Sequence, residues 1–212
     1  ALPFWSEISA DEKDFIYRNS HIICYKKGVS VHDGNECSGV IIVKSGYLRV
    51  YMLSDKGKEI TLYRLYSGDL CMLSASCVIQ AITFDVMINA EEDCECCVIN
   101  GKAFEELSER NPKIKIFALE TAVNRFSDVM WVMQQILFMS TDKRLAIFLY
   151  DESVRTGNKH IEVTHEQIAR YIGTAREVVS RMLKYFTAEG IIETSRKGIN
   201  ILDKEKLRKL TL

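Results

Sequence analysis

The stretch THEQIARYIGTAREVVSRMLKYF, residues 164–186, decides how the C-terminal part of this chain folds. Thr164 and Gln167 have the spacing of a capping box, in which two side chains bond the free backbone groups at a helix start. Thr174 and Glu177 have the same spacing and predict the start of a second helix. Gly173 lies between the two predicted helices and can supply the tight turn that joins them. Two short capped helices around one glycine are typical of a helix-turn-helix.

The residues around this motif complete a winged domain. Apolar side chains at 168, 169 and 172 give the first predicted helix a buried face, and those at 178, 179, 182, 183 and 186 do so for the second. Residues 190–193 and 198–202 flank a polar segment, and this pattern predicts a β-hairpin. We therefore expect residues 140–212 to form a winged helix-turn-helix.

The N-terminal part of the chain has a different periodicity. Between residues 22 and 99, short runs rich in β-branched and aromatic residues alternate with turn signals such as Asp33-Gly34 and Ser45-Gly46. The runs follow one another at spacings of about 8–12 residues, which is typical of all-β sandwiches and barrels. We expect residues 1–110 to form a β jelly roll (double-stranded β-helix), so the fold class of the whole chain is α+β.

A long helix is predicted between these two parts, over residues 111–139. No glycine or further proline interrupts the segment after Pro112, and a helix of this length would extend about 42 Å. Apolar residues at alternating spacings of three and four form a coiled-coil seam, which predicts a dimerisation helix; an ordinary core helix is the alternative. The seam residues are Leu119, Ala122, Phe126, Val129, Met133 and Ile136, whereas Phe117, Trp131 and Phe138 lie off the seam and are expected to pack against the roll.

Composition and charge narrow the class of protein. The chain of 212 residues has a net charge of −1, but residues 141–212 carry 14 basic and 10 acidic side chains, whereas residues 1–140 carry 14 and 19. A basic module beside an acidic one fits contact with phosphates. No apolar run reaches the roughly 18 residues that would span a bilayer. The start of the sequence has no secretion-signal pattern and the cysteine count, seven, is odd, so we expect reduced thiols and a cytoplasmic location.

The sequence contains no recognisable catalytic motif. The four histidines form no His-x-His pair, and neither a Gly-x-Ser-x-Gly pattern nor a phosphate-binding glycine loop is present, so we do not expect an enzyme. Two hypotheses stay open: a DNA-binding regulator, or a protein-interaction or metal/redox-sensing module without sequence-specific DNA binding. The pattern Arg176-Glu177-x-x-x-Arg181 behind two capping boxes favours the regulator.

Several segments resemble the Crp/Fnr family of transcription regulators. Residues 43–51 (VKSGYLRVY), 57–59 (GKE) and 65–69 (LYSGD) are similar to the cyclic-nucleotide-binding roll of that family. Residues 168–183 match its helix-turn-helix pattern nearly throughout, and the resemblance extends over the whole chain. It implies a homodimer that binds a palindromic site in double-stranded DNA, contacts RNA polymerase and is controlled by an effector in the roll.

The resemblance also implies which side chains contact DNA. Arginine pairs bidentately with guanine O6 and N7, and glutamate accepts a hydrogen bond from cytosine N4. The alternatives are that Glu177 only caps its helix, that Arg176 contacts a phosphate, and that the phosphate candidates are plain solvated surface. The expected base contacts are Arg176, Glu177, Ser180 and Arg181, and the expected phosphate contacts are Thr164, Thr174, Lys184, Arg196 and Lys197.

The roll departs from the family pattern at the place where a cyclic nucleotide would bind. Family members that bind cyclic AMP follow Gly-Glu with a phosphate cassette that ends in Arg-Ser or Arg-Thr. Here Gly68-Asp69 matches the start, but Phe84-Asp85 aligns with the end, and no arginine lies between Arg64 and Arg110. A buried phosphate without a cation is unfavourable, so the sequence argues against cyclic AMP. The expected effector pocket comprises Gly68, Asp69, Leu70, Cys71, Ser76, Cys77 and Asp85.

The cysteines are further candidates for sensing. In a strand, Cys94 and Cys96 share one face and Cys97 points to the other. Clustered thiols are able to bind haem, an iron–sulfur cluster or zinc, or to act as a redox switch, and His21 and His32 are alternative haem ligands. The opposing interpretation is that each cysteine is a small buried core residue. The candidate metal ligands are Cys71, Cys77, Cys94, Cys96 and Cys97; the sequence identifies neither the cofactor nor the target genes nor the direction of regulation.

Overall fold

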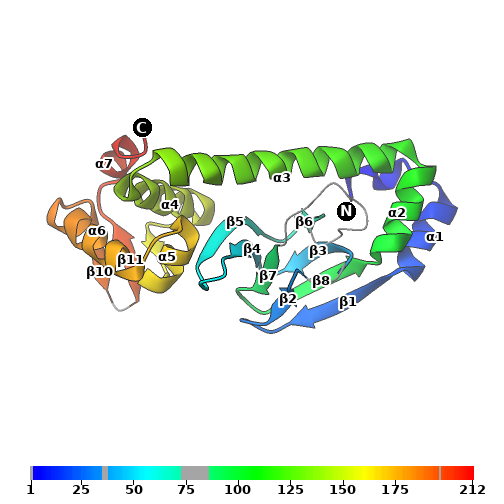
Figure 1. The fold of residues 1–212 in the computed structure, drawn as a ribbon, viewed down its shortest axis with the longest axis horizontal. Helices are drawn as coiled ribbons and strands as arrows, with labels where there is room; N and C mark the ends of the chain where they lie inside the picture. The colour runs from blue at the N-terminus through cyan, green and yellow to red at the C-terminus, as the bar shows by residue number, and fades with distance from the viewer. Residues whose placement is uncertain (1, 35–37, 73–85, 196) are drawn as a thin grey trace. The chain divides into compact units, whose positions relative to one another are not determined.

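The chain forms two compact units, each described here by itself (Figure 1). The computed structural model describes residues 2–34, 38–72, 86–195 and 197–212. Unit 1 comprises residues up to 58 together with residues 62–130, and unit 2 comprises residues 59–61 together with residues 131–212. The expected fold class is confirmed, with a β roll, a long helix and a winged helix-turn-helix in that order.

Unit 1 is built on two four-stranded sheets. One sheet has the order β1-β8-β3-β6 and the other has the order β2-β7-β4-β5. Ile41, Leu48, Val50 and Ile88 are fully buried in the apolar core of this sandwich. Hydrophobic burial on alternate strand residues is therefore what holds the roll together. The strands are β1 (Ser20–Tyr25), β2 (Ser30–His32), β3 (Val40–Ser45), β4 (Leu48–Leu53), β5 (Glu59–Leu65), β6 (Leu70–Cys71), β7 (Met87–Ala90) and β8 (Cys94–Ile99).

The chain reverses between β3 and β4 at Gly46, as the Ser45-Gly46 signal predicts. The φ angle of Gly46 is +74°, and a Cβ atom at this position would lie 2.5 Å from the carbonyl oxygen of Asp93. Only glycine combines the left-handed backbone with so close an approach. The turn carries the chain from one sheet of the sandwich to the other.

Helices gather at one end of the roll (Figure 1). A capping box between Ser9 and Glu12 starts α1, and the side chain of Asn100 accepts a hydrogen bond from the backbone N–H of Ala103 to start α2. Phe104 and Ile114 belong to a second apolar core in which these helices pack against the sheet. The elements are η1 (Pro3–Ser6), α1 (Ala10–Arg18), α2 (Gly101–Arg110) and α3 (Pro112–Phe138).

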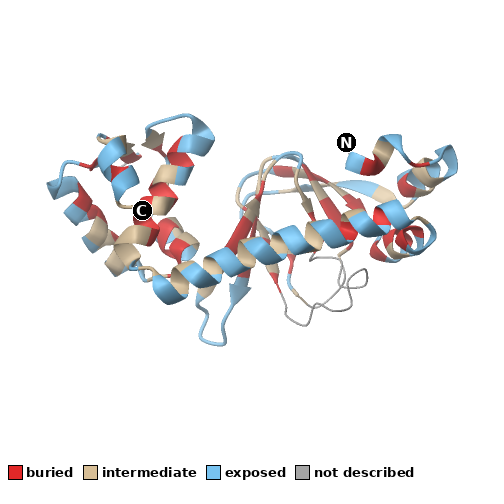
Figure 2. Ribbon diagram, turned by 90° about the horizontal axis from the view of Figure 1, so that it is seen from above, coloured by how far each residue is buried: buried red, intermediate tan, exposed pale blue. Residues whose placement is uncertain are grey.

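Helix α3 begins in unit 1 and its residues from 131 onward belong to unit 2; exposed and less exposed residues alternate along it (Figure 2). Ile114 and Ala118 are buried, and Val129 packs against the core of the sandwich. The opposite face is a row of large apolar side chains at alternating spacings of three and four residues, of which Phe126 is 65% exposed. We call this row the exposed stripe; it consists of Ile116, Leu119, Val123, Phe126, Met130, Met133 and Leu137.

The exposed stripe shares three of its residues with the predicted seam. Leu119, Phe126 and Met133 belong to the stripe, but Ala122, Val129 and Ile136 are half-buried against their own chain. Two apolar rows run side by side along α3, and the sequence alone did not distinguish which row is exposed. Phe117 packs against the second core as expected, whereas Phe138 is 81% exposed and Trp131 is also exposed.

Unit 2 contains the winged helix-turn-helix. Helix α5 packs against α4 and α6, and a sheet of order β10-β11-β9 lies beside them. Leu145, Ile168, Val179 and Phe186 meet in its apolar core, each with almost no exposed surface. The elements are α4 (Thr141–Thr156), β9 (His160–Ile161), α5 (His165–Ile172), α6 (Arg176–Ala188), β10 (Ile192–Ser195), β11 (Gly198–Ile201) and α7 (Lys204–Lys209).

One of the two predicted capping boxes is present. The Thr164 hydroxyl accepts a hydrogen bond from the backbone N–H of Gln167, and the Gln167 side chain accepts one from the backbone N–H of Thr164. Gly173 ends α5 with a φ angle of +66°, as predicted. The second box is wrong: the N-cap of α6 is Ala175, which has no side chain to accept such a bond, so the turn ends one residue later than the sequence pattern indicated.

Candidate nucleic-acid interface and effector pocket

Helix α6 presents a polar row to solvent. Val179, Leu183 and Phe186 are buried, and the 3.6-residue period places the predicted base-contacting residues on the opposite face. Arg176, Glu177 and Arg181 are exposed, and Ser180 is half-buried among them. We call these four residues the recognition row: Arg176, Glu177, Ser180 and Arg181.

The charged members of the recognition row are available to a partner. Arg176, Glu177 and Arg181 form no side-chain hydrogen bond or ion pair with any residue that the structure describes. Glu177 in particular does not cap its own helix, so that alternative is not supported by the geometry of α6. Base edges in a major groove carry hydrogen-bond donors and acceptors with which these side chains could pair.

His165 is a member of this surface that the sequence reasoning overlooked. It is the first residue of α5, and its Nδ1 atom lies 2.9 Å from the Oγ atom of Ser180. Its position directly after the N-cap of the helix that precedes the recognition helix was the available signal. The contact links α5 to the middle of the recognition row.

The predicted phosphate contacts have different surroundings. Thr164 is exposed but uses its hydroxyl as the helix cap, whereas Lys184 and Lys197 are exposed side chains on α6 and on the β10–β11 turn. Thr174 is half-buried, and its backbone N–H donates to the carbonyl oxygen of Ala169. Arg196 lies outside the described residues.

A buried arginine fixes the end of α5. The Nη1 atom of Arg144, on α4, donates a 2.6 Å hydrogen bond to the carbonyl oxygen of Ile172, one of the last residues of α5. Burial lowers the pKa of Arg144 from its ordinary value. A cation at the C-terminal end satisfies a carbonyl that the helix leaves unpaired, so Arg144 helps to hold α5 in position for the turn at Gly173.

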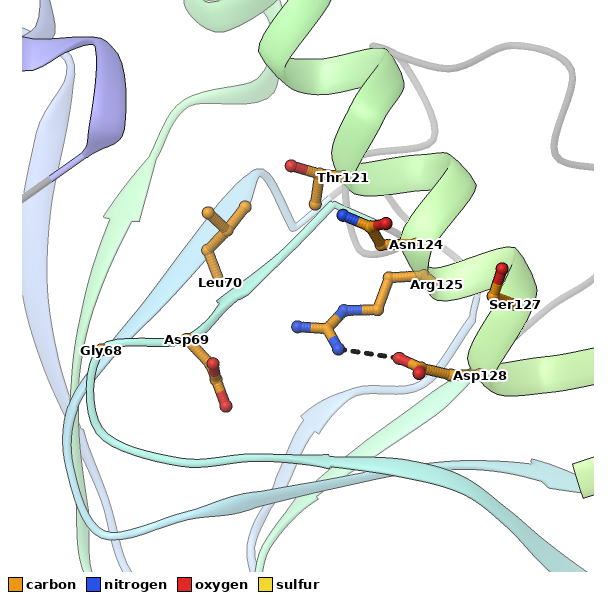
Figure 3. A pocket seen from close by; sticks show the side chains of 8 residues that line it. All are labelled: Gly68, Asp69, Leu70, Thr121, Asn124, Arg125, Ser127 and Asp128. Carbon is orange, nitrogen blue, oxygen red and sulfur yellow. Dashed lines mark hydrogen bonds and ion pairs between the residues drawn. The ribbon is translucent and has the colours of Figure 1, made fainter. Parts of the chain in front are cut away.

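Unit 1 contains a pocket of about 460 Å³ between the start of β6 and helix α3 (Figure 3). The predicted pocket residues Gly68, Asp69 and Leu70 line it. Cys71 does not, because its side chain belongs to the fully buried core of the sandwich. Ser76, Cys77 and Asp85 lie outside the described residues. The sequence reasoning missed the residues from α3, because they become neighbours of β6 only through the tertiary fold: Thr121, Asn124, Arg125, Ser127 and Asp128.

Arg125 brings a positive charge into this pocket from α3. Its Nη1 atom donates a 2.9 Å hydrogen bond to Oδ2 of Asp128, and its guanidinium lies 4.8 Å from the ring centre of Tyr63. Burial raises the pKa of Tyr63 well above its ordinary value, so the phenol beneath the guanidinium stays neutral. The Nε atom of Arg125 is buried and has no hydrogen-bond partner within the described part of the chain. The sequence has no arginine between Arg64 and Arg110, and the fold supplies this one from outside that segment.

Most of the described cysteines are parts of the core. Cys94 and Cys96 are buried on one face of β8 and Cys97 is half-buried on the other, as the strand alternation predicts. Burial raises the pKa of Cys96 to about 12 and also raises that of Cys94. Within the described ranges, no three His, Cys, Asp or Glu side chains are grouped to hold a metal ion. The predicted metal ligands Cys71, Cys94, Cys96 and Cys97 therefore do not converge, and Cys77 lies outside the described residues.

Comparison with known proteins agrees with this architecture. A family model of the cyclic nucleotide-binding domain matches residues 24–111, and a model of the Crp-like helix-turn-helix domain matches residues 143–210. The crystal structure of a protein from Eubacterium rectale ATCC 33656, described as a transcriptional regulator of the Crp/Fnr family, is 42% identical. It covers 99% of this chain, this chain covers 97% of it, and the TM-score is 0.93. The chain belongs to the Crp/Fnr family.

More distant relatives of this Crp/Fnr regulator have similar descriptions. The transcriptional activator protein anr of Pseudomonas aeruginosa is 29% identical over 191 residues, which are 86% of this chain and 77% of that protein. The fumarate and nitrate reduction regulatory protein of Vibrio cholerae is 26% identical, over 99% of this chain and 85% of that protein. The chain is thus a transcription regulator with a DNA-binding helix-turn-helix and a cyclic-nucleotide-binding-like domain. None of the helices in the described ranges is long and apolar enough to cross a membrane.

Proposed function

We propose that this regulator binds a palindromic site in double-stranded DNA as a homodimer, and that an effector held in the roll controls this binding. Residues 1–110 would sense the effector, residues 111–139 would join two protomers and residues 140–212 would bind DNA. The observation that carries the proposal is the recognition row, whose charged side chains are exposed on one face of α6 and form no bond with a described residue. Contact with RNA polymerase and a cytoplasmic location follow from the same role.

The recognition row and the nearby lysines would make different kinds of contact with DNA. Glu177 and Arg181 lie one turn apart on α6, so both are able to reach base edges in one major groove. Arg181 would pair with guanine, and Glu177 would accept from a cytosine amino group. Lys184 and Lys197 would hold the phosphate backbone and add affinity without sequence preference.

The experiment is a selection of binding sites from random DNA, followed by measurement of affinity for the selected site and for scrambled DNA. Wild-type protein is expected to select a palindrome whose half-site centres are about 34–36 Å apart. Arg181→Ala is expected to lose sequence selectivity while it remains a dimer by light scattering. Lys209→Ala, at the end of α7, is the matched control for loss of a positive charge. Equal affinity of the wild type for selected and scrambled DNA would contradict the proposal.

The pocket at Arg125 supports an effector other than a cyclic nucleotide. Two carboxylates, Asp69 and Asp128, line the same space as the single arginine, so a doubly charged or poorly compensated phosphate is disfavoured. Asp128 engages Nη1, and 19% of the Arg125 side chain remains exposed, so the side chain has surface left for an acceptor group of a ligand. We infer a small organic effector that carries an uncharged acceptor group such as a carbonyl oxygen.

A further inference from the structure

Helix α5 places an imidazole against the recognition row. Nδ1 of His165 and Oγ of Ser180 are 2.9 Å apart, and both side chains are half-buried between the two helices. Ser180 lies one turn after Glu177 on the face that the proposed function assigns to the major groove. The serine hydroxyl is therefore not a free rotor, because its hydrogen-bond direction is coupled to the ring of His165.

The direction of this hydrogen bond determines what Ser180 can recognise. A hydroxyl has one hydrogen to donate and two lone pairs that accept, and a neutral imidazole has one donor nitrogen and one acceptor nitrogen. If Nδ1 accepts, Ser180 donates its hydrogen to His165 and can only accept a hydrogen bond from a base. If Nδ1 donates, Ser180 keeps its hydrogen and can donate to guanine O6 or N7 or to thymine O4.

The other nitrogen of the ring selects between these two states. Nε2 of His165 forms no hydrogen bond with any residue in the described ranges. The first helix of a helix-turn-helix crosses the DNA backbone, so in the complex Nε2 would meet phosphate oxygens, which only accept. A neutral ring must then carry its hydrogen on Nε2, which makes Nδ1 the acceptor.

We propose that His165 is a specificity-determining residue that acts through Ser180: it accepts the Ser180 hydroxyl hydrogen, so that Ser180 accepts a hydrogen bond from the amino group of adenine or cytosine. The inference rests on the proposed DNA-binding function. It makes His165 a positioning residue that links a phosphate contact to a base contact. The side chain that touches the base remains Ser180.

Two substitutions separate the contacts of His165. In His165→Asn, the short amide places an oxygen near the position of Nδ1 and keeps the bond to Ser180, but it no longer reaches the phosphate. In His165→Gln, the longer amide reaches the position of Nε2 and loses the bond to Ser180. Glu166→Ala is the matched control, because Glu166 is the exposed neighbour on α5.

The test uses the selected DNA site, with all variants measured in the same mildly alkaline buffer. Comparison of wild type with Ser180→Ala first identifies the base pair that depends on Ser180. At that pair, adenine is replaced by purine without its 6-amino group, or cytosine by pyrimidin-2-one without its 4-amino group. Wild type, His165→Asn and Glu166→Ala are expected to lose about fivefold in affinity on this replacement. Ser180→Ala and the double variant are expected to lose nothing, and His165→Gln, in which the Ser180 hydroxyl is free to turn, is expected to lose clearly less than wild type.

The outcomes separate this inference from the proposed function. If His165→Gln still loses affinity on removal of the amino group as wild type does, His165 does not direct Ser180 and the inference is overturned. The same conclusion follows if removal of the amino group leaves the affinity of wild type unchanged while the selected site is still preferred. If wild type prefers no site at all, the proposed function itself fails.

Discussion

Glu177 and Thr164 are both polar residues of the helix-turn-helix, but the fold leaves them in different states. The hydroxyl of Thr164 and its backbone N–H are both bonded to Gln167, so Thr164 mainly serves the start of α5. Glu177 is exposed and forms no side-chain hydrogen bond with a described residue. At the scale of single residues, a side chain that is already bonded within the chain, such as Thr164, is less available to DNA than an unbonded and exposed one, such as Glu177.

Glu177→Ala is expected to relax specificity at one base pair in each half-site. The carboxylate would otherwise discriminate by accepting from a cytosine amino group, and its loss should cost about 1–3 kcal/mol of discrimination. The measurement is the affinity for the selected site with each of the four base pairs at that position. Glu189→Ala, at the opposite end of α6, is the control and should keep the wild-type ranking. A ranking that is the same in Glu177→Ala and wild type would reject the assignment.

Cys96 should make stability depend on alkaline pH. Burial raises the pKa of its thiol to about 12, above an ordinary value of 9.0, so the unfolded chain releases this proton first. The contribution is fully present below about pH 9 and is lost as the pH rises towards the folded-state pKa.

The free energy of unfolding, measured in urea at a series of pH values, should therefore fall above pH 9. Cys96→Val should reduce the slope, because valine fills the site without a titrating proton. Cys24→Val, at an exposed position on β1, should lower the slope less than Cys96→Val does, because Cys24 acts on the Cys96 pKa only through its charge. Identical slopes in wild type and Cys96→Val would show that the buried thiol does not contribute.

At the scale of elements, the two faces of α3 have different surroundings. One face, through Val129 and Arg125, contributes to the roll core and to the pocket. The other face is the exposed stripe, whose heptad spacing is that of a coiled coil. An apolar stripe of this size is unfavourable in water, so a second copy of α3 is the partner that we expect to cover it.

Phe126→Glu is expected to break the dimer without unfolding the monomer. Phe126 is largely exposed in one chain, but in the dimer two symmetry-related carboxylates would face each other near the centre of the seam. The cost should be several kcal/mol of association free energy. Light scattering over a concentration series measures it, and affinity for the palindromic site should fall in parallel. Glu120→Lys, an exposed charge change on α3, is the control; a Phe126→Glu protein that remains dimeric would contradict the assignment of the stripe.

At the scale of the whole molecule, the chain has the fold of the Crp/Fnr family, but the charged residues of its pocket differ from the cyclic AMP-binding pattern of that family. The roll keeps Gly68 and Asp69, but Oδ2 of Asp69 accepts the backbone N–H of Tyr66 at 2.9 Å and so stabilises the turn. The cation of the pocket comes from α3 and is already paired with Asp128. The pocket is therefore electrostatically unlike one built for a cyclic phosphate.

Cyclic AMP is expected not to bind wild-type protein in isothermal titration calorimetry. The phosphate would have to displace Asp128 from Arg125 and approach Asp69. The unfavourable free energy of these two steps should exceed the attraction between the phosphate and Arg125. Asp128→Asn releases Arg125 and removes one negative charge, so any cyclic AMP affinity should be greater in that variant. A dissociation constant in the micromolar range for wild type would contradict this account.

The sequence correctly predicted the features that depend on near neighbours. Three local patterns predicted backbone features that are all present. They are the helix start at Thr164 and Gln167, the helix end at Gly173 and the turn at Gly46. The capping box at Thr174 was wrong, because the extended residue before α6 is Ala175 and the pattern does not encode where the turn ends.

The sequence by itself determined the fold class and the order of the parts, because periodicity and capping are local. The residues of the recognition row came from the resemblance to the Crp/Fnr helix-turn-helix. Only the tertiary structure decided which of two apolar rows on α3 is exposed, that Arg125 shares a pocket with Asp69, and that His165 touches Ser180. Each of these depends on contacts between segments that are distant in the chain or that face one another across two elements. Such contacts are set by packing, which a linear pattern does not contain.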